Sequence, residues 1–564
     1  MAAQEMEKSV PEGSTSIKSL ITHNNANAVL SFGDGFFTFT SNVKKDPLRI
    51  PIHRVINIET RDERAARQQL HQRNDPSTEG TTTCMPGVVG NAVAQEQDQQ
   101  REEYFLWFLP PRAKAVDEVK CICFCARSGG VASSTEGQGT APLSVLVQKA
   151  LSEIYPTKPK TIVAFVSPKS GSGKAKLMWA TQVLPLLQLT KHQIKSIETT
   201  RAQHAEDWVA DVSNIVTPLH IIVAVGGDGM MHEVVNGWYR RVQSGVDPSS
   251  APMFATVPAG SGCGLAKVCN VLKPIDAAMA LVSADSVAID LMHLRFIDTD
   301  RLVSPTEAEL KAANAAGRAK PQPQLSSLNV AGTLPDRVAF LNVSFAITND
   351  IDKGSEKWRW MGNARFTAHA ATLIAAGIKP YAIRMRYVPW QDSQSGQPLI
   401  KHVGQEKDSS LTSTQCTNTD ACTTCQSARP TAPDASTPWV DVPGDKHVLA
   451  MVNNVAWAAR DMKIAPFAHV ADGAMDLVVG GSIVNGAKED ISRIDFVKLF
   501  LGLEDGAHID ASTVGYMKAT AIEIFPLEGI VMADGEVMPT AGVRVSMLPK
   551  AIRVVRGRID SCKK

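Results

Sequence analysis

The sequence lacks a charge excess of either sign. Its 564 residues include 58 Lys and Arg against 57 Asp and Glu, which gives a formal net charge of +1 at pH 7. Proteins that bind nucleic acid as a polyanion usually show a basic excess or a basic face. We therefore expect no nucleic-acid partner for this chain.

Long apolar runs are also absent. No stretch of about 18 apolar residues occurs, so no transmembrane helix is expected. Residues 1–27 are polar, lack the apolar core of a signal peptide and are predicted to form a flexible tail. The ten cysteines are scattered, as in reduced cytosolic proteins and unlike a disulfide framework. These absences indicate a cytoplasmic protein, and the length indicates several domains.

Residues 28–155 contain short β-like runs that end in an amphipathic helix predicted at 142–154. Several strands closed by one C-terminal helix predict an N-terminal β-rich module that resembles a pleckstrin-homology domain. A polar stretch at 61–101, rich in Gln, Thr and Gly, shows no periodicity and is predicted to be a disordered insert.

The most informative stretch is LHIIVAVGGDGMMHEVVNG, residues 219–237. The run 219–225 is short and rich in β-branched residues, which predicts a buried strand. Glycines then end the strand around Asp228, and apolar residues resume at helical spacing. A strand, a glycine turn and a helix bring backbone N–H groups up to phosphate oxygens. Asp228 is either the N-cap of this helix or a group with a chemical role, because a carboxylate would otherwise repel phosphate.

Two further glycine turns follow predicted strands nearby, PKSGSGK at 168–174 and PAGSG at 258–262. The first is not a Walker A loop, because Pro168 and Ala175 stand where that motif needs Gly and then Ser or Thr. Three such turns, each after an apolar strand, predict one nucleotide site at the carboxyl ends of a parallel sheet. We assign this α/β domain to residues 158–285.

Residues 286–558 are mostly β in character, which predicts a separate antiparallel domain behind the α/β domain. Two polar inserts interrupt it, at 300–336 and 391–438. Apolar helices are predicted at 366–378 and 495–503, and the last β-rich run is a candidate to return to the first domain.

Two groups of cysteines raise the question of metal binding. The first group alternates on one predicted strand and comprises Cys121, Cys123 and Cys125. The second group lies in the second insert and comprises Cys416, Cys422 and Cys425. The first is better interpreted as the small residues of a buried strand face. The second contains one CxxC pair and a third cysteine but no fourth ligand, so a zinc site is disfavoured.

Four motifs together resemble the lipid kinases related to diacylglycerol kinase: GGDGMMHEVVNG, PAGSG, DIDKGSEKWRWMGNARF and the late ADGE. The similarity is greatest to the sphingosine (sphingoid long-chain base) kinases and covers roughly 158–558 without the inserts. It implies an α/β plus mostly-β fold, in which a nucleotide-binding domain with a parallel sheet precedes an antiparallel β-sandwich lipid-binding domain. It also implies transfer of the ATP γ-phosphate to the primary hydroxyl of a sphingoid base, with Mg²⁺, at a peripheral membrane surface.

The resemblance also assigns roles by position. Asp228 matches the catalytic aspartate that takes the proton of the lipid hydroxyl. Asp534 and Glu536 match an acidic pair near the nucleotide and its Mg²⁺, which prefers hard oxygen ligands. The positions that match nucleotide-contacting residues are Ser167, Pro168, Lys169, Gly171, Gly173, Lys174, Thr199, Gly226, Gly227, Gly229, Glu233, Gly260, Ser261, Gly262, Glu356, Arg359, Arg365, Asp534, Gly535 and Glu536.

Asp352 matches the aspartate that pairs with the sphingoid amine. The amide of ceramide and the esters of diacylglycerol are neutral and would leave a carboxylate there unpaired. The alternative interpretation of Asp352 is a helix cap or turn residue, so a ceramide or diacylglycerol kinase is the alternative activity. A catalytically dead lipid-binding scaffold is a more remote one.

Two positions depart from the family pattern. Ser167 stands where Asn usually precedes the proline, and Cys263 stands where Asn usually follows PAGSG. Both replace an amide side chain, but neither changes Asp228, so we expect activity to be retained. The sequence leaves open the preferred chain length and the oligomeric state, a homodimer included.

Overall fold

The computed structural model describes seven strands within residues 17–127 and most of residues 159–557. Within that second range it does not describe residues 169, 171–172, 216–218, 261, 298–301, 304–323, 326–333, 363, 392–398, 402–421, 423, 426–436, 482–491 and 540–541.

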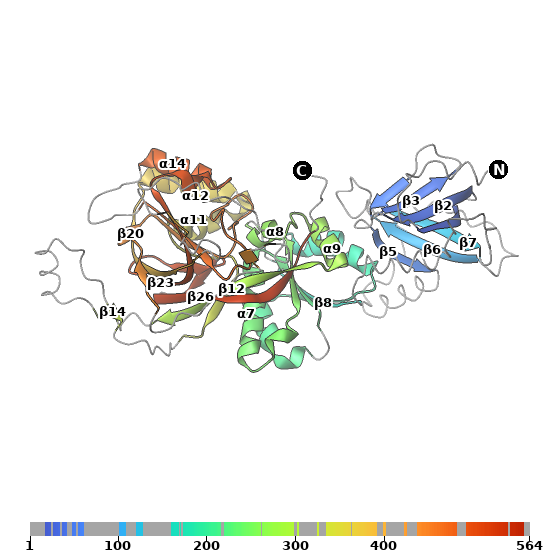
Figure 1. Cartoon of the computed structure of the whole chain (residues 1–564), viewed down its shortest axis with the longest axis horizontal. Helices are drawn as coiled ribbons and strands as arrows, with labels where there is room; N and C mark the ends of the chain where they lie inside the picture. Colours follow the sequence, from blue (N-terminus) through green and yellow to red (C-terminus); the bar gives the residue numbers. More distant parts are fainter. Residues whose placement is uncertain are drawn as a thin grey trace, which may run out of the picture.

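The N-terminal strands, drawn in blue in Figure 1, form one antiparallel sheet in the order β4-β3-β2-β1-β7-β6-β5. They are β1 (Ile17–His23), β2 (Ala26–Gly33), β3 (Phe36–Ser41), β4 (Leu48–Pro51), β5 (Val55–Thr60), β6 (Arg101–Phe108) and β7 (Lys120–Arg127). The β-rich character predicted for this region is confirmed. The flexible tail predicted for 1–27 is wrong at β1, which pairs with β2 along its whole length. The predicted helix at 142–154 and insert at 61–101 contain no residue that the structure describes, apart from the start of β6.

Five parallel strands, in the order β9-β8-β10-β11-β26, form the sheet of the α/β domain. They are β8 (Thr161–Val166), β9 (Gln193–Glu198), β10 (Ile221–Gly226), β11 (Met253–Pro258) and β26 (Gly542–Val555). The central strand β10 is buried along its whole length, as expected for a β-branched strand covered on both faces. The predicted strand before each glycine turn is therefore confirmed.

Helices cover both faces of this sheet, with α7 on one side and α8 and α9 on the other (Figure 1). The helical segments are α4 (Ala175–Met178), η5 (Trp179–Val183), α5 (Leu184–Gln188), α6 (His204–Ala210), η6 (Val212–Asn214), α7 (Asp228–Gln243), η7 (Pro248–Ser250), α8 (Gly264–Val268) and α9 (Pro274–Ser283). A helix follows the first glycine turn, but a π-helical turn interrupts it just before Pro185. Proline has no N–H to donate to the preceding turn, which accounts for the irregularity.

The second domain is an antiparallel β structure with its own core. Its strands are β12 (Ser286–Ile297), β13 (Leu302–Val303), β14 (Gln324–Leu325), β15 (Arg337–Ala339), β16 (Asn342–Ala346), β17 (Tyr381–Pro389), β18 (Ile400–Lys401), β19 (Val440–Asp441), β20 (Lys446–His447), β21 (Leu449–Asn453), β22 (Met475–Gly480), β23 (Val514–Pro526), β24 (Val531–Ala533) and β25 (Glu536–Met538). Alternate residues of the long strands, such as Tyr387, Leu477 and Ile522, fill that core.

The last strand, β26, belongs to both domains. It runs antiparallel to β12 from one end to the other, while its C-terminal end also pairs in parallel with β11 and its N-terminal part pairs antiparallel with β23. The predicted return of the final strand is confirmed. One continuous strand therefore links the parallel sheet of the α/β domain to the β domain.

Helices of the second domain gather at the end of the β structure where Figure 1 labels α11, α12 and α14. They are α11 (Ile347–Ser355), η9 (Glu356–Met361), α12 (Ala364–Ala376), α14 (Arg493–Gly502) and η10 (Ala507–Asp510). The two apolar helices predicted in this domain are confirmed within two residues at each end. Among the helices that the structure describes, none has both the length and the apolar character needed to cross a bilayer.

Candidate active site

The three glycine turns meet at the carboxyl ends of the parallel strands. A Cβ added to Gly226 would lie 2.8 Å from Oγ of Ser170, so the second turn packs against the first. A Cβ added to Gly260 would lie 2.9 Å from the backbone nitrogen of Gly227, so the third turn packs against the second. Only glycine permits approaches this close. The predicted convergence of the turns is confirmed in the residues that the structure describes.

Asp228 is the first residue of α7, and Gly227 holds the N-cap position. The interpretation of Asp228 as the N-cap of its own helix is therefore wrong. Its carboxylate instead accepts hydrogen bonds from the backbone N–H groups of Gly264 at 2.8 Å and Leu265 at 3.3 Å. These are the first residues of α8, so the aspartate joins the second glycine turn to the helix that follows the third.

The electrostatic surroundings of Asp228 suit a proton acceptor. Desolvation by burial raises the pKa of this carboxyl to about 6, and the negative charge of Asp534 contributes. The two backbone N–H groups and the positive charge of Arg460 oppose the shift. A general base is most effective when its pKa lies near the working pH, because it is then both ionised and basic.

Asp534, in the ADGE turn between β24 and β25, is a buried organising residue. Its carboxylate accepts hydrogen bonds from three successive backbone N–H groups, at Phe340, Leu341 and Asn342, over 2.8–3.3 Å. Its second oxygen lies 2.9 Å from Nδ1 of His232, on the turn of α7 that follows Asp228. Because its oxygens already accept these hydrogen bonds, Asp534 is better suited to position neighbouring groups than to bind the predicted metal ion. The metal role stays a prediction for Glu536.

Glu536 approaches the start of α7, where a Cβ added to Gly229 would collide with the glutamate carboxylate. Desolvation raises the pKa of Glu536, and the negative charges of Glu233, Asp352 and Glu356 raise it further. A divalent cation would relieve this accumulation of acidic groups. The described carboxylates do not form a preassembled group of three, so they fit Mg²⁺ held by one or two carboxylates and by nucleotide phosphates.

Arg365, at the start of α12, brings a buried cation to the same region. Its side chain is 6% exposed, and Nη2 lies 3.4 Å from Oδ1 of Asp352. Nη1 lies 3.8 Å from Oε1 of Glu356, which is too long for a hydrogen bond. Nε and Nη1 are buried without any hydrogen-bond partner among the described residues. Unsatisfied buried donors are costly, and a phosphate would satisfy them.

Asp352 faces the ADGE turn as well as Arg365. A Cβ added to Gly535 would lie 3.8 Å from Oδ2 of Asp352. The predicted substrate-binding aspartate and the predicted acidic turn are therefore neighbours, although Asp352 and Asp534 lie 182 positions apart in the sequence. Asp352 lies inside α11 and not at its start, so the helix-cap interpretation does not apply.

The remaining predicted site residues fall into four groups. Thr199 is buried at the end of β9, and the backbone N–H of Ser167 donates to Val225. Glu233 accepts a hydrogen bond from Ala205 at the start of α6, which is a local structural contact. Gly173 and Lys174 precede α4, and Pro168 and Gly262 lie in their turns. The structure does not describe Lys169, Gly171, Ser261 or the side chain of Arg359.

Two site residues escaped the sequence prediction, His232 and Arg460. His232 falls on the same helical face as Asp228, four residues later, and this spacing was the available signal. Arg460 comes from the loop after β21, where its backbone N–H donates to Gly262 at 3.1 Å. Nothing near Arg460 in the sequence links it to the glycine turns. A strand-like bridge between Cys263 and Ala459 brings the two segments together.

Cys263, one of the departures from the family pattern, has a structural role. It adopts the left-handed backbone conformation at φ 51° as the N-cap of α8, and its thiol donates to the carbonyl of Gly260 at 3.2 Å. Burial raises the pKa of this thiol to about 12, so it stays protonated.

Comparisons with known proteins match both domains. Residues 161–294 match the "Diacylglycerol kinase catalytic domain", and residues 440–556 match the "YegS C-terminal NAD kinase beta sandwich-like domain". Sphingosine kinase 1 of Arabidopsis thaliana is 28% identical over 392 residues, which cover 68% of this chain and 69% of that protein. Sphingosine kinase 1 of Homo sapiens is 26% identical over 407 residues, 72% of this chain and 92% of that protein. A crystal structure of a diacylglycerol kinase from Bacillus anthracis aligns with 71% of this chain and 98% of its own at 14% identity, with a TM-score of 0.41.

Proposed function

We propose that this homologue of the sphingosine kinases, built on a diacylglycerol kinase catalytic domain, transfers the γ-phosphate of ATP to the primary hydroxyl of sphingosine or a related sphingoid long-chain base. The single observation that carries the proposal is the position of Asp228. It stands where three glycine turns meet, and its carboxyl pKa of about 6 suits proton transfer.

The chemistry assigned to Asp228 is general-base catalysis. The lipid hydroxyl donates its proton to the carboxylate as its oxygen attacks the γ-phosphorus. The bond from that phosphorus to the bridging oxygen breaks, and ADP leaves. Each carboxylate oxygen has two lone pairs, so accepting from Gly264 and Leu265 leaves room for the substrate proton. Those two donors also fix the carboxylate in one orientation.

The glycine turns and Arg365 are assigned to the phosphates. The glycines allow the backbone to approach phosphate oxygens at the N-terminus of α7, where the helix dipole favours negative charge. Arg365 offers Nε and Nη1, two buried donors that lack partners among the described residues. Glu536 would hold Mg²⁺ together with the phosphates, and the ion would neutralise charge on the transferred group.

Substrate choice is assigned to Asp352. Its carboxylate, which lies 3.4 Å from the Arg365 guanidinium, is the anionic group to which we assign the sphingoid ammonium. A neutral ceramide or diacylglycerol offers no cation there, which disfavours those lipids.

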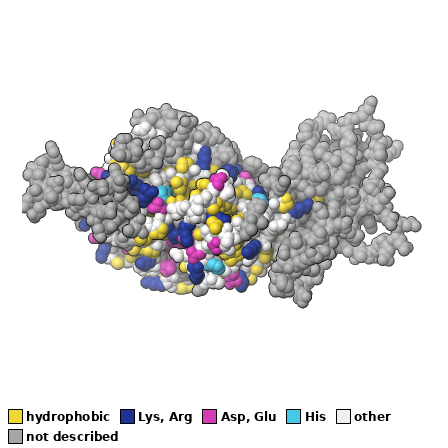
Figure 2. Space-filling model, turned by 90° about the horizontal axis from the view of Figure 1, so that it is seen from below, with side chains coloured by type: hydrophobic (Ala, Val, Ile, Leu, Met, Phe, Trp, Pro, Cys, Tyr) yellow, Lys and Arg dark blue, Asp and Glu magenta, His cyan; other side chains and the backbone are white. Residues whose placement is uncertain are grey.

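Access to a lipid substrate requires contact with a membrane, and α14 provides a suitable surface. Ile494, Val497 and Leu501 are spaced to lie on one face of α14, and their exposed fractions are 69%, 40% and 68%. We propose that this face docks the enzyme peripherally from the cytoplasm, with the N-terminal sheet as a pleckstrin-homology-like recruiting module. On the face seen from below, Figure 2 shows basic and acidic side chains interspersed over the described residues.

A lipid panel tests the proposal. Sphingosine, dihydrosphingosine, phytosphingosine, ceramide and diacylglycerol are each incubated with labelled ATP and the full chain. The expected product is phosphorylated sphingoid base, with little label in the other two lipids. Asp352→Asn should raise the KM for sphingosine about tenfold, through loss of about 1.4 kcal/mol of charge pairing. Preferential labelling of ceramide or diacylglycerol, or no labelling of any lipid, would contradict the proposal.

A further inference from the structure

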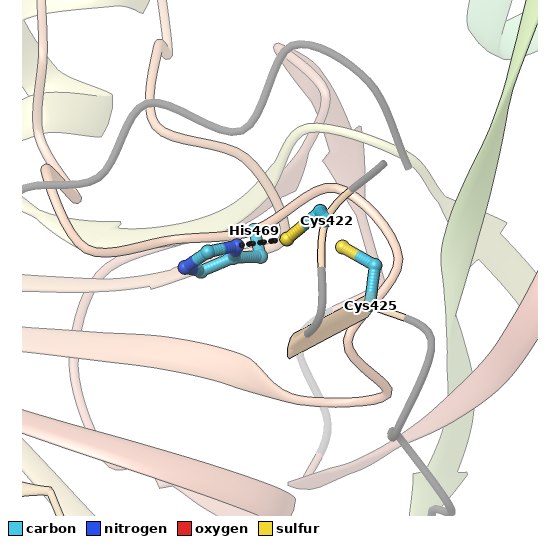
Figure 3. A group of neighbouring side chains, drawn as sticks. All are labelled: Cys422, Cys425 and His469. Atoms are coloured by element: carbon cyan, nitrogen blue, oxygen red, sulfur yellow. Dashed lines mark hydrogen bonds between the residues drawn. The ribbon is translucent and has the colours of Figure 1, made fainter. Parts of the chain in front are cut away.

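Three side chains of types that commonly bind metal ions meet outside the active site, as Figure 3 shows. Cys422 and Cys425 come from the second insert, and His469 comes from the segment between β21 and β22. Nδ1 of His469 lies 3.3 Å from Sγ of Cys422, and the three ligand atoms all lie within 4.8 Å of one another. Within the described part of the chain this is the one group of at least three such side chains.

The separations fit one tetrahedral metal ion. With Zn–S bonds of about 2.3 Å and Zn–N bonds of about 2.0–2.1 Å, a sulfur and a nitrogen ligand stand about 3.5 Å apart. The distance of 3.3 Å between Cys422 and His469 lies within a few tenths of that value. The spacing of the two cysteines is the CxxC spacing found in structural zinc sites. Soft thiolate and imidazole ligands also select zinc over the Mg²⁺ of the kinase reaction.

We propose that Cys422, Cys425 and His469 bind a zinc ion, with water in the fourth position. On binding, the two thiols each release a proton to solvent and the imidazole binds as the neutral tautomer, so no oxidant is needed. Two thiolates balance the charge of Zn²⁺. A neutral complex suits this location, since Cys425 is fully buried and both cysteines pack against the core of the α/β domain.

The location gives the ion a structural role. His469 is followed by Val470 and Ala471, which are buried in the core, and the carbonyl of Val470 accepts from the backbone N–H of Asp290 on β12. The ion would link the second insert to the segment between β21 and β22, which also positions Arg460 in the active site. The proposal does not depend on the lipid that the enzyme phosphorylates.

A disulfide between Cys422 and Cys425 is the competing use of the same residues. It would leave His469 without a role, whereas the histidine nitrogen lies against the Cys422 sulfur. It would also remove both thiols from reaction with an alkylating reagent, which separates the two possibilities.

Metal analysis of the purified full chain tests the proposal. The protein is reduced, supplied with Zn²⁺ and dialysed, and its zinc content is then measured by inductively coupled plasma mass spectrometry. We expect about one zinc ion per chain. Cys422→Ser, Cys425→Ser and His469→Ala should each lose most of the zinc, whereas the control Cys562→Ser, which removes a thiol outside the insert, should retain it. Less than about a tenth of an ion in the wild type, or equal zinc in the variants, would overturn the proposal.

Cobalt substitution gives a second readout that a simple loss of folding does not imitate. Co²⁺ in a tetrahedral site with two thiolates should give strong visible bands and thiolate charge-transfer absorption, which Cys425→Ser should weaken. Absence of the charge-transfer absorption in the wild type, or protection of both cysteines from alkylation without metal, would contradict thiolate ligation.

Discussion

The glycine turns of the α/β domain and the segment 347–365 of the second domain contribute to the same site in opposite ways. The turns set the shape of the site. Gly226, Gly227 and Gly260 let the three loops approach one another so closely that a side chain at Gly226 or Gly260 would collide with the neighbouring loop. The second domain supplies charge, through Asp352, Glu356 and Arg365. In the proposed site, the turns of one sheet therefore set the position of the phosphates, whereas the second domain adds the charged groups that bind the phosphates, through Arg365, and select the lipid, through Asp352.

The largest effect should follow from removing the base on the glycine-turn side. We expect Asp228→Asn to lower kcat about 10³-fold, because general-base catalysis typically contributes ~10²–10⁴-fold. The amide oxygen can still accept one of the two backbone hydrogen bonds, so nucleotide binding should change little. Steady-state kinetics and ATP titration measure the two quantities. A comparable loss of ATP binding would show that Asp228 shapes the turn and does not act as the base.

The next largest effect should come from the charge supplied by the second domain. Arg365→Met should lower kcat/KM about 10²-fold, because a positioned donor to the developing phosphate charge is lost. Arg365→Lys should recover only part of it, since an ammonium lacks the planar fork. Arg386→Lys is the matched control, because Arg386 pairs with Glu523 away from the site. Full recovery by lysine would reduce the role of Arg365 to that of a point charge.

A smaller effect should come from adding one methyl group where the two regions touch. Gly229→Ala places a Cβ against the carboxylate of Glu536 and should lower kcat about tenfold, because small displacements of reacting groups are costly. Gly480→Ala is the control, since its Cβ would make ordinary contacts with Leu449 and Leu499 at 3.4–3.5 Å. Equal kinetics for wild type and Gly229→Ala would show that Glu536 moves freely and that the two regions are not tightly joined.

The smallest effect should appear at α14, the helix proposed to contact the membrane. Replacing Ile494, Val497 and Leu501 with Ser should lower binding to phospholipid vesicles several-fold and leave activity on detergent-dispersed sphingosine unchanged. Lys498→Ser, on the same helix, is the control for loss of charge. The fraction of protein that sediments with the vesicles measures the binding. Unaltered sedimentation of the triple variant would place membrane contact elsewhere.

The sequence allowed the catalytic face to be predicted because its determinants are local. An apolar strand, a glycine turn and a helix occur three times, and parallel strands place their carboxyl ends at one edge. The role of Asp534 could not be predicted in this way, since the residues that bond to its carboxylate lie far away in the sequence, at His232 and the backbone of residues 340–342. The same holds for Arg460.

The second insert, which carries Cys422 and Cys425, is another case in which residues distant in the sequence form one group. CxxC with one further cysteine lacked a ligand in the sequence, and the metal interpretation was disfavoured for that reason. In the proposed site the additional donor is His469, which follows β21 and belongs to the body of the domain. Cys416, the third cysteine of the insert, lies outside the described residues. A ligand set divided between an insert and the domain core leaves no spacing rule to detect.

The pH dependence of kcat/KM, compared in the wild type and Asp228→Asn, tests the central claim most directly. Burial holds the carboxyl pKa of Asp228 at about 6, so the reactive ionised form is present above that pH and is lost as the pH falls through it. We predict that wild-type kcat/KM for sphingosine falls about tenfold per pH unit below roughly pH 6, and that the residual activity of Asp228→Asn lacks this limb. An acid limb near pH 6 that persists unchanged in Asp228→Asn would contradict the assignment of Asp228 as the base.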